Sequence, residues 1–207
     1  MGRPRKHDLD DLLDAAEALL AESGHGALTV RAVADAVGGS TGSLYHAFRS
    51  RNELLGQMWL RAARRFLAVQ REAVDVCLQR SPTHEGAVEA TIAAASSYEL
   101  LRRQHPTSAQ LLMEYRRDAL LDDGLPDELA AQLRTLEGEL VELMRRLAVA
   151  LWGRADRYTV DAVAVCVVDL PPGLLNGWRP RVSDPLDSLA AAVRGVLATT
   201  PPNRKPA

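Results

Sequence analysis

The sequence predicts an all-α protein, in which an N-terminal three-helix helix-turn-helix domain precedes a C-terminal helical bundle, with about nine helices in all. Apolar residues recur at helical spacing along most of the 207 residues. Glycines and prolines separate these runs, and the alternating pattern of strands is scarce. A glycine turn in segment 29–53 joins two short helices, with a third helix starting behind them.

The first helix is predicted over residues 8–22 and ends at Ser23-Gly24. Its acidic residues at the N-terminal end suit the positive end of the helix dipole. We expect it to be a scaffold against which the following helices pack. Its apolar stripe consists of Leu9, Leu12, Leu13, Ala16, Leu19 and Leu20.

The next helix has a short apolar face that ends at a glycine turn. Val30, Val33, Ala34 and Val37 recur at i, i+3, i+4 and i+7. The following Gly38-Gly39 tolerates the left-handed backbone that a tight turn between helices needs.

A second short helix and a long third one follow this turn. Ser40 is placed to cap the second helix, in which Leu44 and Phe48 can point inward. Ser50 and Glu53 match the S-x-x-E capping box and open the third helix. This spacing is typical of a helix-turn-helix, which lays its second helix in the major groove of DNA.

These residues resemble the N-terminal domain of the TetR/AcrR repressor family. The resemblance is close over roughly the first quarter of the chain and extends to the remainder only in helical character and length. Arg51 stands where the family usually has lysine, and Gly39 where it more often has a larger residue. The matching segments are Thr29-Val30-Arg31-Ala32-Val33-Ala34, Val37-Gly38, Ser40 to Phe48 and Ser50-Arg51-Asn52-Glu53-Leu54-Leu55.

The resemblance implies which residues contact DNA. Thr41, Ser43, Tyr45 and His46 are expected to face the groove, while neighbouring residues hold phosphates. The basic segment 1–7 is either a solvated chain start or an arm on the DNA backbone or minor groove. The full predicted set is Arg3, Arg5, Lys6, Thr29, Arg31, Ser40, Thr41, Gly42, Ser43, Tyr45, His46 and Arg51.

The body, predicted over residues 55–200, continues the helical pattern, and residues 201–207 are expected to be a disordered tail. One long helix reaches from Ser50 to about Leu78, and its arginines, Arg61, Arg64, Arg65 and Arg71, are expected on a solvated face. The later helices are predicted over 85–103, 107–121, from Pro126 onward, 159–170 and from Pro185 onward. The run 159–170 is apolar nearly all round, which predicts burial, and Pro171-Pro172 is expected to kink or end it.

Similarity to the family implies a small-molecule site in the body and a homodimer through the last two helices. Dimerisation also follows from DNA recognition, because one short reading helix covers few base pairs. The run around Val160 to Val168 and the last helix are the candidate interface. Predicted ligand contacts are Trp59, Phe66, Tyr98, Met113, Tyr115, Met144, Trp152 and Cys166, with plain core packing as the alternative for each large side chain. Cys166, Asp161, Asp169 and His105 are possible polar anchors, for which a surface position or an interhelical hydrogen bond is the alternative.

Composition restricts the possible functions and the location of the protein. A net charge of −2 requires that DNA binding come from a local basic surface. The two cysteines, Cys77 and Cys166, suggest neither a disulfide framework nor a metal site. No signal peptide or apolar run of transmembrane length is recognised, so we expect a cytoplasmic protein without membrane contact.

The sequence thus favours a dimeric, sequence-specific transcriptional regulator on a palindromic operator. It is expected to be a repressor released by a small apolar or amphipathic ligand. A regulator without an effector is the alternative, and an all-helical enzyme is a distant third. Gly38–Gly42 matches the G-x-S-x-G nucleophile elbow, but no strand precedes it. His84-Glu85 beside Cys77 is weak evidence for a metal, so no catalytic residue, cofactor or metal is predicted.

Overall fold

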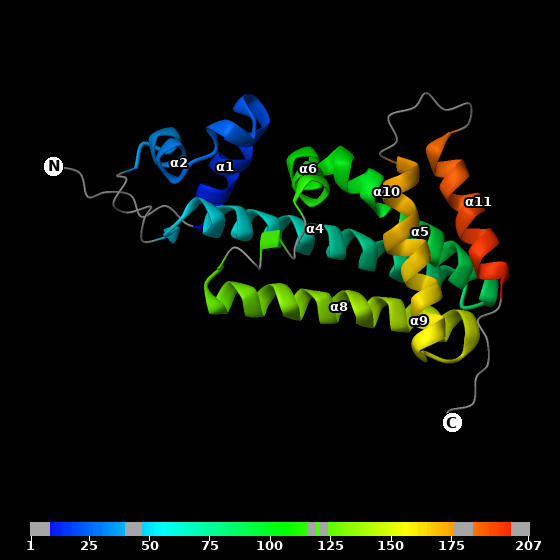
Figure 1. The fold of residues 1–207 in the computed structure, drawn as a ribbon. Coiled ribbons are helices and arrows are strands. Elements are labelled where there is room, and N and C mark those ends of the chain that lie inside the picture. The colour runs from blue at the N-terminus through cyan, green and yellow to red at the C-terminus, as the bar shows by residue number, and fades with distance from the viewer. Residues whose placement is uncertain (1–8, 40–46, 116–118, 121–123, 176–183, 200–207) are drawn as a thin grey trace. The chain divides into compact units, whose positions relative to one another are not determined.

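The computed structural model describes residues 9–39, 47–115, 119–120, 124–175 and 184–199 (Figure 1). Every regular element in these ranges is a helix, which confirms the predicted all-helical class. The chain forms two compact units, Met1–Arg65 with Gln104–Leu136, and Phe66–Arg103 with Glu137–Ala207. The long helices α4 (Arg51–Arg80) and α8 (Asp127–Trp152) supply residues to both units. The functional boundary after residue 54 stays a prediction.

The first unit holds α1 (Leu9–Ser23), the 3-10 turn η1 (His25–Ala27), α2 (Val30–Ala36) and α6 (Pro106–Glu114). Helix α1 packs against both α2 and α6. Its predicted stripe is buried at Leu12, Leu13, Ala16 and Leu20. Leu9 is 41% exposed, so its assignment to the buried stripe is wrong.

Helix α6 is shorter than the run 107–121 predicted from the sequence. Pro106 occupies a first-turn position, where its missing N–H costs nothing, and the helix ends at Glu114. Tyr115 then takes an extended conformation, and its carbonyl accepts a 3.0 Å hydrogen bond from the Trp59 indole N–H. The Tyr115 carbonyl, which the predicted helix would have bonded within itself, is therefore bonded by Trp59 of α4 instead.

The second unit holds α5 (His84–Gln104), α9 (Arg157–Ala164), the π-helical turn η2 (Val165–Asp169), α10 (Leu170–Leu175) and α11 (Pro185–Ala198). Helix α11 packs beside α9, η2 and α10 (Figure 1). Asp184 caps α11 through a 2.8 Å hydrogen bond from the Leu186 N–H, which confirms the predicted start. Arg194 of α11 pairs with Glu85 and Glu89 of α5.

The prolines at 171 and 172 do not end the apolar helix. Proline lacks an N–H, and its ring collides with the carbonyl four residues earlier in an α-helix. Here η2 widens the turn immediately before them, with the Leu170 N–H bonded to the Val165 carbonyl five residues back. The helical path therefore continues to Leu175, and the predicted interruption appears as a π turn.

The segment Arg157–Leu175 is not buried as predicted. Only 28% of it is buried inside the chain, and Tyr158 and Val168 are exposed. By length and composition this is a helix that could cross a membrane, so the prediction that no run reaches that length is wrong. The segment carries Asp161 and Asp169 and packs on α11, and core helices of soluble proteins pass the same test.

Candidate nucleic-acid interface

The predicted contact residues Thr29 and Arg31 lie at the start of α2. Thr29 Oγ1 accepts a 3.0 Å hydrogen bond from the Ala32 N–H and caps the helix. Both residues are exposed, whereas Val30 between them is buried. A capping hydroxyl still has its own proton to donate, so Thr29 can cap the helix and donate a hydrogen bond to a phosphate oxygen at the same time.

The turn after α2 has the hydrogen bonds of a Schellman motif. The Gly39 N–H bonds the Ala34 carbonyl at 3.0 Å, and the Gly38 N–H bonds the Asp35 carbonyl at 3.2 Å. Gly38 has φ +65°, the left-handed conformation predicted for it. This turn fixes the direction in which the chain leaves α2.

Several predicted DNA contacts lie outside the described residues. They are Arg3, Arg5 and Lys6 of the N-terminal segment and Ser40, Thr41, Gly42, Ser43, Tyr45 and His46 of the predicted reading helix. The chain is described again from Ala47, and Phe48 is completely buried, as predicted.

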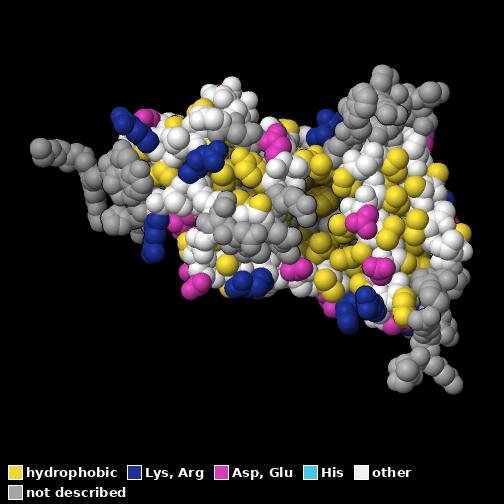
Figure 2. All heavy atoms as spheres, in the orientation of Figure 1, with side chains coloured by type: hydrophobic (Ala, Val, Ile, Leu, Met, Phe, Trp, Pro, Cys, Tyr) yellow, Lys and Arg dark blue, Asp and Glu magenta, His cyan; other side chains and the backbone are white. Residues whose placement is uncertain are grey.

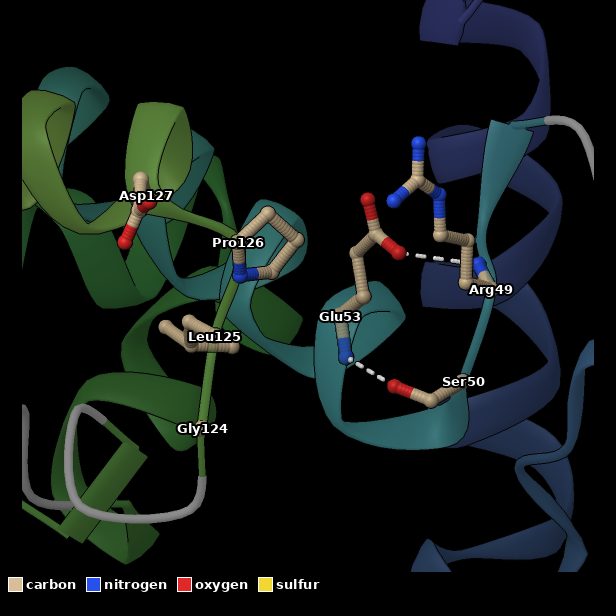
Figure 3. A pocket seen from close by; sticks show the side chains of 7 residues that line it. All are labelled: Arg49, Ser50, Glu53, Gly124, Leu125, Pro126 and Asp127. Carbon is tan, nitrogen blue, oxygen red and sulfur yellow. Dashed lines mark hydrogen bonds between the residues drawn. The ribbon is translucent and has the colours of Figure 1, made fainter.

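The capping box at the start of α4 is confirmed, with one difference from the usual pattern. Ser50 Oγ accepts a 3.0 Å hydrogen bond from the Glu53 N–H. The Glu53 carboxylate reaches back to the Arg49 N–H at 2.8 Å, one residue before the cap (Figure 3). The chain entering α4 is thereby held at Ser50 and at Arg49, directly behind the predicted reading segment.

Arg51, predicted to hold a phosphate, also makes a hydrogen bond within the predicted DNA-binding domain, residues 1–54, which we call the head. Its Nε donates a 2.9 Å hydrogen bond to the Leu28 carbonyl, 23 residues earlier. Arg49 is exposed on the same stretch. Nothing in the sequence indicated Arg49, because the family motif marks position 51 and an exposed arginine two residues earlier has no periodic pattern of its own.

Two of the four α4 arginines that were predicted to be solvated, Arg61 and Arg65, instead bind α1 and α6, whereas Arg64 is exposed as predicted. Arg61 is 13% exposed and pairs with Asp14 and Glu17 of α1, each at 2.8 Å. Arg65 pairs with Glu17 at 2.9 Å and donates to Ser108 Oγ of α6 at 3.0 Å. Helix α1, at the base of the helix-turn-helix, is therefore joined by charge-assisted bonds to α4 and indirectly to α6.

An open, polar hollow of about 460 Å³ lies next to the capping box (Figure 3). Leu125 and Pro126 face Glu53 across it. A methyl group on Gly56 would lie 2.9 Å from Leu129 Cδ2 and 3.0 Å from Leu125 Cδ2. The chain around the start of α8 therefore approaches the first turns of α4 closely at Gly56, where a side chain would require these two leucines to shift.

The predicted ligand contacts are divided between the two units. Trp59 bonds the Tyr115 carbonyl in the first unit, and Met113 there is 39% exposed. Phe66 and Tyr98 in the second unit form an edge-to-face pair with centroids 6.4 Å apart, and burial raises the pKa of Tyr98. The same unit holds the half-buried Trp152 and the buried Met144 and Cys166.

The predicted polar anchors of the ligand differ in exposure and in hydrogen bonding. Asp161 and Asp169 are exposed, and His105 precedes α6 without a side-chain cap bond. Burial raises the pKa of the Cys166 thiol to about 12, which keeps it protonated and unreactive. The His84 ring Nδ1 lies 3.0 Å from the Leu151 carbonyl, and the described residues contain no group of His, Cys, Asp and Glu suited to a metal.

Known proteins resemble this chain in its N-terminal sequence and in its fold. Residues 12–58 match the family model for bacterial regulatory proteins of the tetR family. No curated protein sequence matches the chain.

Solved structures share its fold. A tetR family regulatory protein from Rhodococcus RHA1 has 19% identity and a TM-score of 0.62, over 92% of this chain and 95% of that one. PfmR, a TetR family transcriptional regulator from Thermus thermophilus, has 20% identity and a TM-score of 0.57, over 90% and 97%. FadR from Bacillus subtilis, in complex with stearoyl-CoA, has 16% identity and a TM-score of 0.61, over 93% and 98%.

Proposed function

We propose that this TetR family transcriptional regulator is a homodimeric cytoplasmic repressor that leaves a palindromic operator when a small apolar or amphipathic ligand binds its bundle. The bonded frame around the reading segment carries the proposal. The Schellman turn at Gly38 precedes that segment and the Ser50–Glu53 box follows it. A segment anchored at both ends meets phosphates and bases in a fixed register, which sequence-specific recognition requires.

The apolar surface of the second unit supports the homodimer. Figure 2 shows hydrophobic side chains gathered over α9, α10 and α11. Tyr158 and Val168 are exposed on the segment Arg157–Leu175, which the chain itself leaves mostly uncovered. A second copy related by two-fold symmetry would bury this surface and place two reading helices on two half-sites.

A ligand in the bundle is supported by the aromatic pair on α4 and α5 and by a relative. Phe66 and Tyr98 are half-buried and offer apolar contact. FadR, which has the same fold, was solved with stearoyl-CoA. The bundle residues predicted from the sequence remain the proposed contacts.

Helix α4 would transmit ligand binding to the head. It begins at the capping box and carries Trp59 and Phe66 further along. A ligand that displaces either side chain would tilt the start of α4 and change the separation of the two reading helices. The ligand must bind the arrangement that is free of DNA more tightly than the DNA-bound one. By reciprocity, operator DNA must then weaken ligand binding by the factor by which the ligand weakens operator binding. A coupling free energy of about 1–3 kcal/mol is usual.

Replacing Tyr45 with alanine tests the DNA-reading assignment. The operator is first recovered as genomic fragments bound by the wild-type protein, and affinities are then measured on it. Tyr45→Ala should weaken operator binding by about 1–3 kcal/mol, the usual scale for one good contact. Tyr45→Phe, which keeps the ring, separates stacking from the hydroxyl bond. Wild-type affinity in a correctly folded Tyr45→Ala variant would remove Tyr45 from the interface.

Deleting residues 1–6 tests the basic arm. If Arg3, Arg5 and Lys6 each meet a phosphate, the slope of log K against log salt should become shallower by about one unit per lost contact. Arg51→Ala is the comparison, because Arg51 bonds the Leu28 carbonyl. It should reduce affinity by loosening the head while changing the slope less than the deletion does. A slope that the deletion leaves unchanged would show that the arm makes no phosphate contact.

A further inference from the structure

Gln70 is a buried polar residue in an apolar layer between α4 and α5. Phe66 meets Tyr98 edge-on, and four residues later on α4 the Gln70 amide meets Ala94, four residues before Tyr98 on α5. Gln70 is only 1% exposed. The two helices therefore run antiparallel here and present one glutamine among aromatic and small apolar side chains.

Only half of the Gln70 amide is bonded. Its Nε2 donates a 3.3 Å hydrogen bond to the Ala94 carbonyl, whereas its buried Oε1 has no hydrogen-bond partner among the described residues. The amide cannot be reversed, because two carbonyl oxygens would then face each other. Leaving a buried acceptor unbonded costs about 1–3 kcal/mol, so its retention calls for a partner.

The nearby hydroxyl groups of α5 do not supply that partner. Thr91 Oγ1 donates to the Ala87 carbonyl at 2.9 Å, and Ser97 Oγ donates to the Ala93 carbonyl at 2.7 Å. A hydroxyl has a single proton to donate, and both protons are used within the helix.

We infer that Gln70 Oε1 accepts a hydrogen bond from the effector, and that the effector is an apolar molecule carrying a neutral donor, such as a hydroxyl or amide N–H. This deepens the proposed function, on which it rests. An anionic group would meet the carbonyl oxygen as a second acceptor. A cation would need a counter-charge, and the carboxylates that flank Ala94 along α5, Glu89 and Glu99, already pair with arginines. Phe66 and Tyr98, one helical turn away, would contact the apolar body.

Matched probes that differ only in the donor test this inference. Decanol and naphthol are each compared with their methyl ethers, which keep the apolar body and lose the O–H. Binding is measured by calorimetry and naphthol fluorescence. The wild-type protein should bind the hydroxyl member of at least one pair about five- to tenfold more tightly than its ether, the scale of one hydrogen bond.

Gln70→Met removes the acceptor at similar length, and Gln79→Met is the control, because Gln79 is exposed on the same helix. The hydroxyl preference should vanish in Gln70→Met and persist in Gln79→Met. Without probe, the melting temperature of Gln70→Met should equal or exceed that of the wild-type protein, because an unbonded acceptor has been removed.

Several results would overturn the inference: equal binding within both wild-type pairs, binding of neither pair, or a preference that survives in Gln70→Met. A melting temperature of Gln70→Met that falls by more than the loss of the Nε2 bond to Ala94 explains would show that Oε1 is already bonded without an effector. Operator titrations without probe separate this outcome from the proposed function. A wild-type protein that binds no operator would remove the repressor proposal, while the hydroxyl preference would still decide the role of Gln70.

Discussion

Val168→Arg is expected to make the protein monomeric and to lower its operator affinity by a factor of about a hundred or more. Val168 is 43% exposed on η2, within the proposed dimer surface. A guanidinium there would lose its hydration in the dimer but would remain solvated in the monomer. Two linked half-sites bind about 10²–10⁴-fold more tightly than one, and a monomer loses that gain.

Val76→Arg is the matched control for this prediction. Val76 is 55% exposed on α4, outside the proposed surface, and the substitution adds the same charge. Sedimentation and operator titration should show a dimer with nearly wild-type affinity for Val76→Arg, and circular dichroism should show intact helices in both variants. A Val168→Arg protein that remains dimeric would place the interface on another surface.

Local sequence signals predicted α2, the turn after it and the start of α4 well. The spacing of Val30, Val33 and Ala34, the glycine at 38 and the Ser50–Glu53 box each act within a few residues. The structure confirms them as a buried face, a left-handed turn and a closed cap. A cap or turn depends on neighbours in the chain, so its residues reveal it without tertiary information.

The errors arose where a distant partner determines the outcome. Periodicity put Arg61 and Arg65 on a polar face and could not indicate that Glu17 of α1 lies there. The end of α6 depends on the Trp59 indole, 56 residues earlier in the chain than Tyr115. Gln70 gave no signal at all, because an isolated glutamine on a long helix is ordinarily solvated.

The candidate DNA site was predicted largely through resemblance rather than local physics. Thr29 and Arg31 are exposed at the start of α2, as a phosphate-contacting role requires. Arg51 shows the limit of the motif, because the same side chain also bonds the Leu28 carbonyl. The family motif thus indicated the position of a cation, Arg51. The structure adds that the Arg51 side chain bonds the Leu28 carbonyl, whereas Arg49 is exposed.

Gly86→Ala is expected to lower the free energy of unfolding by about 3 kcal/mol, at the upper end of overpacking substitutions. A methyl group on Gly86 would lie 1.8 Å from the Ser81 carbonyl oxygen and 2.8 Å from its carbonyl carbon. Both are backbone atoms, so no side-chain rotation can relieve the collision. The turn into α5, where Thr83 Oγ1 accepts the Gly86 N–H at 3.2 Å, must open.

The damage should reach the proposed dimer surface, because Glu85 beside Gly86 pairs with Arg194 of α11 at 2.9 Å. Gly86→Ala should therefore weaken dimerisation as well as stability, which urea unfolding and sedimentation can measure separately. Gly138→Ala is the matched control: no atom lies within 4 Å of its added methyl group on α8. There alanine should stabilise the helix by about 0.5–1 kcal/mol, since glycine loses more backbone entropy on folding. Equal stability of the two variants would show that the chain between Ser81 and Gly86 moves freely enough to admit a side chain, and that the start of α5 does not hold α11 in place.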